Sequence, residues 1–499
     1  MSNWYVLFFL LMLVRVPYYA THHVQEDAYI TFRSAFHLAD HGQFSYNLGT
    51  HTPGVTSMLY GPIVALLRVL FRGYAIIAVQ IFGTAMQTLG ALLLAKSLFT
   101  DTKRQKILFV LAGLLPISLM LSYTGMETPI LTMVVCWSMY MVRTGTPTWW
   151  CLLPIYLLPM VRPDSVSYGL LLACLIFSMS RIKGIAAAVV TGAGALTVLI
   201  FNKIVSGEYI TNTMRAKEII YSPSHKIGII LERTWLTFVR GSFGALIWTP
   251  MFARVGIVTI LLAILCAVVI VRRQRGAPVQ RLFLFMIAAG LIIPFCYDVG
   301  GVLFPWYLWV PSWLLLCICC YPLAEYLATP GLRWRRHAIA LTCICLLVLD
   351  AGQWVFSFSK GLEEYRYRAG VGLDLKSIAH PGDTLFLESA GYIPFFSELY
   401  TDDNVGLGSR RMLDYAAKYG YYYMYHFVQE CKPTFIVNVP GKPRWDRDAV
   451  MQQWLASHYH IAKHYHYDPA NYVHSPLLLR LLKDTTVFDY DVWETNDRT

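Results

Sequence analysis

The chain has 499 residues, of which 56% are hydrophobic and only 14% are charged, and its mean hydropathy is +0.48. Soluble globular domains carry about 25% charged residues, so the composition excludes an ordinary soluble protein. The long apolar runs are too uniform for the alternating strands of a membrane barrel, which leaves a bundle of membrane-spanning helices. The formal charge of +11 is attributed to membrane topology, and no nucleic-acid partner is expected.

Eleven apolar segments have lengths compatible with the roughly 20 residues that a helix needs to cross a bilayer, although two in the middle are short. The first segment carries Arg15 and lacks a small-residue cleavage site, which favours a retained transmembrane helix over a cleaved signal peptide. The predicted spans are residues 4–20, 74–95, 107–123, 128–142, 149–161, 165–180, 184–202, 253–271, 282–298, 303–321 and 338–355.

Segment 57–71 is ambiguous because it is short, contains Pro62 and ends in Arg68. Four connecting loops are strongly basic, and the positive-inside rule places all four in the cytoplasm. All four loops lie on the same side only if segment 57–71 does not cross the membrane, so it is expected to lie in the membrane interface as a juxtamembrane helix. The basic loops are residues 96–106, 181–183, 272–281 and 333–337. The segments that then face outward are residues 21–73, 124–127, 162–164, 203–252, 299–302 and 356–499.

The end of the chain is polar and tyrosine-rich, with short apolar runs bounded by Gly, Pro and Asp: DTLFLES, PTFIVNVPG and SPLLLRLLKD. Strand-sized runs that alternate with helical stretches indicate a small α/β domain. The expected fold is therefore an all-α polytopic membrane bundle over residues 1–355, with extracytoplasmic loops 21–73 and 203–252. An extracytoplasmic soluble α/β domain would follow over residues 356–499.

An acidic pair, Glu26 and Asp27, stands directly after the first span. Tyr29, Phe32 and Phe36 follow at helical spacing and form an apolar stripe, which predicts an amphipathic helix in the membrane interface. Such a helix would hold both carboxylates at headgroup depth. The alternative is an acidic turn that only stabilises the helix dipole. Two adjacent carboxylates could also bind Mg²⁺ or Ca²⁺, although the pair is a weak signal for a metal site.

Further polar clusters fall on the same predicted face of the membrane, in TGMET, VRPDS, GEYITNTMRAKE, YDVGG and FPWYLWVP. Ionisable residues at membrane depth are costly and mark sites or pathways, although each one alone is more often a helix-end anchor. Their gathering on one side favours a shared site. The candidate residues are Glu127, Arg162, Asp164, Asn212, Arg215, Lys217, Asp298, Trp306 and Tyr307.

These residue types together suit a lipid-phosphate substrate. Arginine and lysine bind phosphate, carboxylates act as general bases or metal ligands, and aromatic rings flank sugars or apolar chains. A basic clamp beside a hydrophobic bundle fits a phosphate on a lipid. Because ATP is not at hand outside the cytoplasm, an activated lipid-linked donor is the natural energy source.

The stretch EDAYITFRSAFHLADHGQFSYNLGTHTPGVTS resembles the first extracytoplasmic loop of GT-C glycosyltransferases, where an acidic pair opens the loop. TGMET, RPD, the stretch ending NTMRAK and the Pro-aromatic-Tyr motif resemble later landmarks of that superfamily. SAGYIPFFSELYTDDNVGLGS resembles part of its C-terminal soluble domain. The resemblance runs in order along nearly the whole chain, but each motif is short.

The nearest branch resembles the terminal arabinofuranosyltransferases of mycobacterial cell-wall arabinan and their bacterial relatives, which use a polyprenyl-phosphate sugar donor. Two departures stand out. Glu26 occupies a position where Asp is expected, which makes Asp27 the better candidate for the catalytic carboxylate and Glu26 a supporting group. The stretch from Asn47 to Thr50 lacks the acidic residue of the family element, which bears on donor and acceptor identity.

The resemblance implies transfer of a sugar, with arabinofuranose as the candidate, from polyprenyl phosphate to a glycan or protein acceptor outside the cytoplasmic membrane of a bacterium. Asp27 would take the acceptor proton in an inverting reaction, or stabilise developing positive charge in a retaining one. The expected phosphate-binding residues are Arg162, Arg215, Lys217 and Tyr307. The expected sugar- or acceptor-binding residues are Glu127, Asp164, Asn212, Asp298 and Trp306.

Three other functions remain open. A ligase or polymerase of lipid-linked glycans would share the phosphate clamp, but the early acidic pair argues against it. A glycolipid transporter would bind its substrate near the bilayer midplane, often between internal repeats, and no repeat is visible. A non-catalytic scaffold would explain the soluble end of the chain and leave the one-sided polar clusters unexplained.

Overall fold

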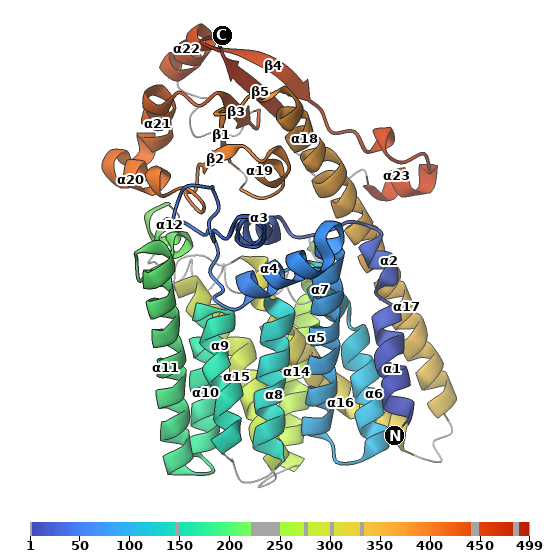
Figure 1. The fold of residues 1–499 in the computed structure, drawn as a ribbon. Coiled ribbons are helices and arrows are strands. Elements are labelled where there is room, and N and C mark those ends of the chain that lie inside the picture. The colour runs from blue at the N-terminus through green and yellow to red at the C-terminus, as the bar shows by residue number, and fades with distance from the viewer. Residues whose placement is uncertain are drawn as a thin grey trace.

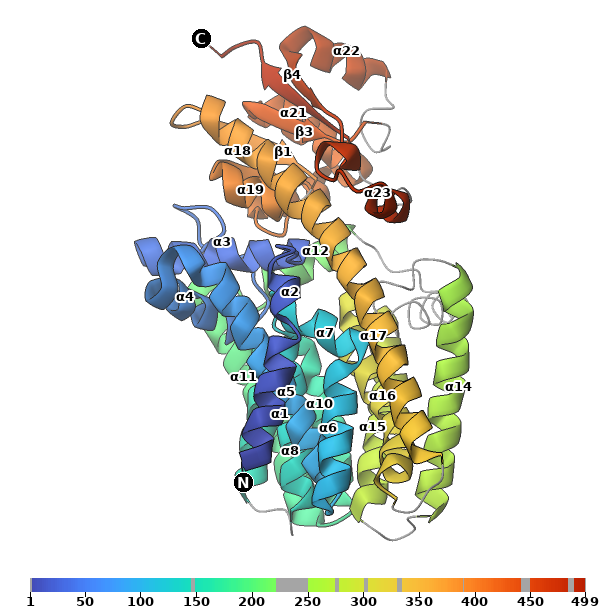
Figure 2. The same cartoon turned by 90° about the vertical axis from the view of Figure 1, so that its right-hand side faces the viewer.

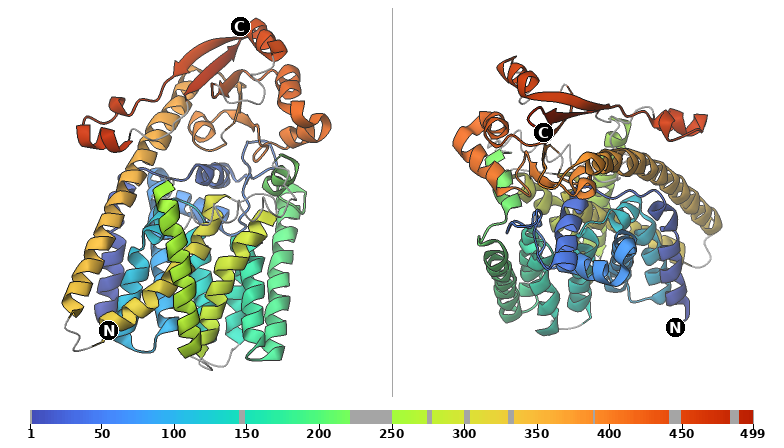
Figure 3. Two further views of the ribbon diagram at one scale, coloured as in Figure 1. Left: turned by 180° about the vertical axis from the view of Figure 1, so that it is seen from behind. Right: turned by 45° about the horizontal axis from the view of Figure 1, so that its top comes forward.

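The computed structural model describes residues 2–144, 149–220, 250–273, 278–299, 304–329, 334–388, 390–440, 449–482 and 489–498. A bundle of roughly parallel helices forms one half of the molecule, and a smaller unit with a β-sheet sits on one end of it (Figures 1 and 2). Helix α3 (Glu26–His41) crosses the end of the bundle beneath the smaller unit, as Figure 3 shows from behind.

Every one of the eleven predicted apolar segments contains helix. The bundle consists of α1 (Ser2–Leu13), α2 (Val16–Tyr19), α5 (Ala75–Leu98), α6 (Thr102–Leu114), α7 (Pro116–Tyr123), α8 (Thr128–Arg143), α9 (Leu152–Val161), α10 (Val166–Phe177), α11 (Arg181–Ser206), α14 (Pro250–Arg273), α15 (Pro278–Val299), α16 (Trp309–Ala328) and α17 (Arg335–Lys360). By length and composition, five helical stretches of the described chain could each cross a membrane, or six if the bent pair α6–α7 counts as one span. The number of crossings, eleven, stays a prediction.

Helix α4 (Tyr60–Phe71) corresponds to the ambiguous segment 57–71. It packs against α3 and lies across the end of the bundle (Figure 1). The chain then turns at Arg72, whose φ of 48° is unusual for a residue with a side chain, before α5 enters the bundle. This placement is the one expected of a juxtamembrane helix.

The apolar stripe of α3 is buried in protein and does not face lipid. The ring of Tyr29 lies 4.1 Å from that of Tyr392 and 4.8 Å from that of Phe395, both in α19 (Tyr392–Ser397). Phe36 also contacts Phe395, at 5.4 Å. The predicted helix is therefore confirmed, and its apolar stripe is covered by the C-terminal unit, whereas its position in the membrane interface stays a prediction.

Arg33 on α3 is buried and joins three distant parts of the chain. Its Nε donates to the Tyr46 carbonyl at 2.7 Å, and its Nη2 donates to the Leu399 carbonyl at 2.6 Å and to Asn47 Oδ1 at 3.1 Å. Its Nη1 donates to the carbonyl of Pro394. Because a buried guanidinium must fill its hydrogen bonds, α3, the loop after it and the C-terminal unit are fixed to one another.

The bundle and the C-terminal unit are connected by continuous helix. α17 passes into a π-helical segment, η6 (Gly361–Arg368), and then into α18 (Ala369–Ile378). The predicted domain boundary at residue 355 therefore falls inside α17. Gly361 is required at the junction, because a Cβ there would lie 1.7 Å from the Thr21 carbonyl oxygen.

The C-terminal unit contains a five-stranded mixed sheet of order β2-β1-β3-β5-β4. β1 pairs in parallel with β2 and β3, whereas β5 pairs antiparallel with β3 and β4. The elements are β1 (Thr384–Leu387), β2 (Tyr400–Asp403), α20 (Arg410–Tyr419), α21 (Tyr423–Cys431), β3 (Phe435–Asn438), α22 (Ala449–His458), β4 (Tyr459–Tyr465), α23 (Pro476–Leu482) and β5 (Tyr490–Thr495). The small α/β unit expected from the sequence is thus present.

Two of the three strand-sized runs form strands, and the third does not. DTLFLES contains β1 and PTFIVNVPG contains β3, but SPLLLRLLKD contains helix α23. Leucine and arginine are strong helix formers and the run has no β-branched residue, so local propensity favours the helix.

The Arg33 network yields a stability prediction. Arg33→Met removes four hydrogen bonds from buried carbonyl and amide oxygens, and we expect it to destabilise the fold by about 3 kcal/mol. Thermal unfolding of the purified protein in detergent measures the change. Lys376→Met is the control, since its ion pair with Glu398 is exposed and is worth about 0.5 kcal/mol. Equal shifts in the two variants would contradict the assignment.

Candidate active site

A cavity of about 680 Å³ lies where the end of the bundle, α3 and the C-terminal unit meet. The bundle contributes its floor, and the loop after β1 together with the loop after β2 contributes residues opposite. The lining residues are Glu26, Asp27, Ile30, Thr31, Gly54, Thr56, Met126, Glu127, Arg162, Pro163, Asp164, Thr213, Met214, Lys217, Glu218, Cys296, Phe304, Trp306, Tyr307, Glu388, Ala390, Val405 and Leu407.

Most of the residues selected from the sequence meet in this cavity, although they come from segments up to about 280 residues apart in the chain. Those that line it are Glu26, Asp27, Glu127, Arg162, Asp164, Lys217, Trp306 and Tyr307. Asp298 lies in the last turn of α15, and its side chain is outside the described part of the structure. Asn212 and Arg215 lie elsewhere.

The two carboxylates of the acidic pair have different surroundings. Glu26 accepts hydrogen bonds from the Arg368 guanidinium and from the backbone N–H of Gly391, at 3.1 Å for the latter. Asp27 is half-buried and has no hydrogen-bond or ion-pair partner among the described residues. The side chain of Asp27 is therefore the one that is available to a ligand.

Burial raises the pKa of Asp27 to about 7, and the neighbouring negative charge of Glu26 acts in the same direction. Lys217 and Arg162 oppose this shift, and Glu127 adds to it. Asp27 also lies in the first turn of α3, where the helix dipole favours a negative charge. A carboxylate that titrates near neutral pH in a cavity has the property required of a general base.

Arg162 organises the floor of the cavity. Its Nη1 donates to Glu127 Oε1 at 3.0 Å, and its Nε and Nη2 donate to the two oxygens of Asp164 at 3.1 and 2.7 Å. The guanidinium also lies 4.6 Å from the centre of the Tyr307 ring. Arg162 is thus strongly engaged with protein groups, and its main effect is to fix two carboxylates beside the cavity.

Lys217, on α12 (Asn212–Ile220), is the cation that projects toward the centre of the site. Its Nζ donates to the Tyr307 hydroxyl and lies 4.9 Å from the centre of that ring. Burial lowers the pKa of Lys217, while Asp164 and Asp27 act to raise it. A lysine and a tyrosine hydroxyl next to each other form a suitable clamp for one phosphate group.

The TGMET turn holds Glu127 against this site. Gly125 has a φ of 75°, and a Cβ there would come within 2.9 Å of the Phe32 ring, so only glycine fits. The backbone N–H of Gln25 donates to the Thr124 carbonyl at 2.9 Å, and the Tyr60 hydroxyl donates to the Gly125 carbonyl. These hydrogen bonds fix the turn to the residue before α3 and to the first residue of α4.

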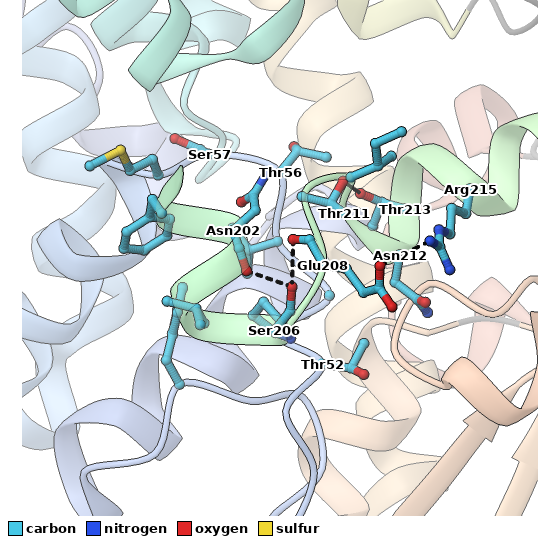
Figure 4. A pocket seen from close by; sticks show the side chains of 18 of the residues that line it. Thr52, Thr56, Ser57, Asn202, Ser206, Glu208, Thr211, Asn212, Thr213 and Arg215 are labelled. Carbon is cyan, nitrogen blue, oxygen red and sulfur yellow. Dashed lines mark hydrogen bonds and ion pairs between the residues drawn. The ribbon is translucent and has the colours of Figure 1, made fainter. Parts of the chain in front are cut away.

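Asn212 and Arg215 line a second pocket, of about 20 Å³, beside the main cavity (Figure 4). Arg215 donates to Glu208 at 3.1 Å, and Glu208 also accepts from Arg410 at 2.9 Å. Asn212 Nδ2 donates to the Gly406 carbonyl at 2.5 Å. These side chains connect α12 to the C-terminal unit. Their position outside the main cavity does not support the prediction that Asn212 binds the sugar or acceptor and that Arg215 binds the donor phosphate.

The sequence analysis missed the cavity residues contributed by the C-terminal unit, namely Glu388, Ala390, Val405 and Leu407, and the contact of Arg368 with Glu26. The run TDDNVGLGS was the available signal. Asp403 accepts from the backbone N–H groups of Leu407, Gly408 and Ser409 at 2.6, 2.8 and 3.1 Å, which fixes the loop that presents Leu407 to the cavity. Burial raises the pKa of Asp403 to about 6.

Within the described part of the chain, no group of three or more His, Cys, Asp and Glu side chains has a metal-binding arrangement. Glu26 lines the cavity, but its two carboxylate oxygens already accept hydrogen bonds from Arg368 and from the backbone N–H of Gly391. A divalent cation held by both Glu26 and Asp27 does not fit this arrangement.

Comparisons with known proteins identify the fold. The sequence model of a family described as "Domain of unknown function (DUF8728)" matches residues 360–488, and no curated protein matches the chain. The crystal structure of ArnT from Cupriavidus metallidurans in the apo state superposes with a TM-score of 0.59, at 13% identity, over 93% of this chain and 96% of ArnT. The structure of that protein bound to undecaprenyl phosphate gives a TM-score of 0.56, at 12% identity, over 100% of this chain and 99% of ArnT.

The chain therefore has the fold of ArnT along its whole length, in agreement with the GT-C-like architecture expected from the sequence. Together with the apolar helices, this fold defines a multi-pass membrane protein. The narrower resemblance to the arabinofuranosyltransferase branch is not tested by these comparisons.

The ion pairs of Arg162 lead to a second stability prediction. Arg162→Gln leaves Glu127 buried without a cation, and we expect a loss of about 3 kcal/mol in stability, measured by thermal unfolding. The double variant Arg162→Gln with Glu127→Gln should recover part of that loss. Arg68→Gln, which breaks the more exposed pair with Asp40, is the control and should cost less than about 1 kcal/mol. A double variant less stable than Arg162→Gln alone would refute the pairing.

Proposed function

We propose that this protein is a membrane glycosyltransferase that moves a sugar from a polyprenyl-phosphate donor to an acceptor on the outer side of the membrane. The observation that carries the proposal is a cavity at the end of an apolar bundle. It holds Asp27, which has no hydrogen-bond or ion-pair partner among the described residues, and the pair Lys217 and Tyr307. The likeness to ArnT, which has been crystallised with undecaprenyl phosphate, supports a lipid-phosphate ligand.

In the proposed reaction an acceptor hydroxyl attacks the anomeric carbon of the donor sugar. The bond between that carbon and the lipid-phosphate oxygen breaks, and its electron pair stays on the phosphate. Asp27 takes the proton of the attacking hydroxyl, which its pKa of about 7 permits near neutral pH. The products are the glycoside and the polyprenyl phosphate, so no cofactor is consumed.

Lys217 and the Tyr307 hydroxyl hold the departing phosphate by charge-assisted hydrogen bonds, which strengthen as negative charge grows on its oxygens. The positive charge of Arg162 also attracts the phosphate, while its own hydrogen bonds hold Glu127 and Asp164 in place. Those two carboxylates and Trp306 are suited to binding sugar hydroxyls and the sugar face. Phe304 and Met126 give the cavity an apolar wall for the first part of the lipid chain.

We further propose arabinofuranose as the sugar, a glycan or protein as the acceptor, and the inner membrane of a bacterium as the location, with the cavity and the C-terminal unit outside the cytoplasm. The first-loop resemblance and the basic loops at the opposite end of the bundle support these assignments. A ligase of lipid-linked glycans would use the same phosphate clamp and is distinguished by transferring a whole glycan.

The proposal predicts that Asp27→Asn abolishes transfer without unfolding the protein. Asparagine keeps the size of the side chain but cannot accept the proton, so transfer should fall by about 10² to 10⁴. The measurement is transfer of radiolabelled sugar from synthetic polyprenyl-phosphate arabinofuranose in membranes, beside glucose, mannose and aminoarabinose donors. Asp40→Asn, outside the cavity, is the matched control and should retain activity.

Full transfer by Asp27→Asn at normal expression would refute the role of Asp27 as base. Absence of transfer from every monosaccharide donor by folded wild-type protein would refute the proposed reaction, and whole lipid-linked glycans would then be the donors to test.

The proposed orientation predicts the labelling of Cys296, an exposed cysteine that lines the cavity. A membrane-impermeant thiol reagent added from the extracytoplasmic side should modify Cys296 in a Cys431→Ala background, as read by mass spectrometry. Undecaprenyl phosphate should slow the reaction because its phosphate and first isoprene units fill the cavity. Labelling only from the cytoplasmic side would contradict the orientation, and Cys296→Ser is the control for specificity.

A further inference from the structure

Arg368 lies behind the acidic pair, at the end of the π-helical segment η6. Its Nη1 donates both to Glu26 Oε2 and, at 2.9 Å, to Glu364 Oε2. The side chains of Arg368 and Glu26 are 10% and 17% exposed, so the pair is largely removed from water. Among the described contacts, this is the one that joins a charged side chain of the helix formed by α17, η6 and α18 to the acidic pair.

We propose that Arg368 is a positioning residue for the transfer reaction. It binds Glu26 and neutralises its charge, so that Asp27 alone acts as the base. Because Arg368 belongs to the C-terminal unit, this pairing forms only when that unit is docked on the bundle. This inference rests on the proposed function, and it assigns to the C-terminal unit a direct part in setting up the catalytic carboxylate.

The two carboxylates of the acidic pair leave α3 in different directions. Adjacent residues on a helix point about 100° apart, so Glu26 and Asp27 cannot share one direction. Arg368 and the backbone N–H of Gly391 hold both oxygens of Glu26 on the side of the C-terminal unit. Gly391 is packed so closely that a Cβ there would lie 2.4 Å from the Glu26 carbonyl oxygen. The side chain of Asp27 then points into the cavity without a competing partner.

Arg368 is the last residue of the π-helical segment η6. π-helical turns are uncommon and occur frequently at functional sites. Here the segment begins at Gly361, which contacts the Thr21 carbonyl, and ends at Arg368, which contacts Glu26. One end of the segment therefore contacts the stretch that joins α2 to α3, and the other end contacts the first residue of α3. A change in the position of η6 would therefore move Arg368 relative to the acidic pair.

Arg368 lies among several charged side chains. Around Arg368 lie three carboxylates, Glu26, Glu363 and Glu364, and one further cation, Lys360, which pairs with Glu363. Loss of Arg368 would leave the negative charge of Glu26, the residue next to Asp27, without its cation. The charged groups that act on Asp27 from the other elements are Glu127, Arg162 and Lys217. A carboxylate next to uncompensated negative charge binds its proton more tightly.

The test is the pH dependence of transfer by the full chain in membranes. In the wild type, kcat should fall as the pH drops below about 7, because Asp27 then becomes protonated. Arg368→Gln should move this acidic limb to higher pH, and Glu26→Gln should move it to lower pH, each by about half a unit or more. The double variant should return toward the wild-type midpoint, and Arg368→Lys should restore much of the wild-type profile.

Arg498→Gln is the matched control. Arg498 is 14% exposed, also pairs with two carboxylates, Asp383 and Glu494, and also lies in the C-terminal unit, but away from the cavity. We expect it to lower the midpoint of thermal unfolding without moving the pH profile. Unchanged pH midpoints in both Arg368→Gln and Glu26→Gln, with activity lost only in proportion to unfolding, would overturn the proposal.

The two proposals can fail separately. If wild-type protein transfers and the pH midpoints do not move, only the role of Arg368 is wrong. If folded wild-type protein transfers nothing, the proposed function is wrong, and the inference is then judged by thermal unfolding of the two single variants and the double variant. Additive losses of stability would show that Glu26 and Arg368 do not act as a pair, and would overturn it as well.

Discussion

The burial of charged side chains on α3 is the constraint on which the rest of the structure depends. Arg33 and Glu26 lie on a helix that is covered by the bundle on one side and by the C-terminal unit on the other, so Arg33 is buried and Glu26 is only 17% exposed. Some of their partners, among them Leu399 and Arg368, come from residues more than 340 positions later in the chain. Because unpaired buried charges cost several kcal/mol, α3 has its observed position only when the two parts of the chain are docked.

The same constraint divides the acidic pair into two roles. Glu26 is used to hold the C-terminal unit in place, and Asp27, one residue later, is left beside Lys217 and Tyr307 in the cavity. The cavity therefore exists only at a junction: neither the apolar bundle nor the small mixed sheet contains it alone. This arrangement gives a physical reason for a soluble unit on a membrane enzyme of the proposed kind, since the unit completes the site and sets the charge around it.

Local pattern was enough to predict the helices and most of the cavity. Helical spacing located α3, and the gathering of polar residues on one side of the membrane selected Glu127 and Lys217 from distant segments. Amphipathicity shows which face of a helix is apolar but not what covers it, so the sequence did not reveal that the stripe of α3 packs on α19. Arg368 gave no signal, because EEYRYR is an ordinary charged run until tertiary contacts bring it to Glu26. Arg215 shows the converse, a basic residue in a promising motif that is used for an ion pair with Glu208.

The most direct test of the central claim is a cryo-EM structure of Asp27→Asn in lipid nanodiscs with an intact polyprenyl-phosphate sugar donor. The account predicts that the donor phosphate lies within about 3 Å of Lys217 Nζ and the Tyr307 hydroxyl, with the anomeric carbon exposed toward residue 27. It also predicts that Glu26 remains bound to Arg368. A donor phosphate bound outside this cavity, or a sugar directed away from residue 27, would contradict the assignment of the site and of its base.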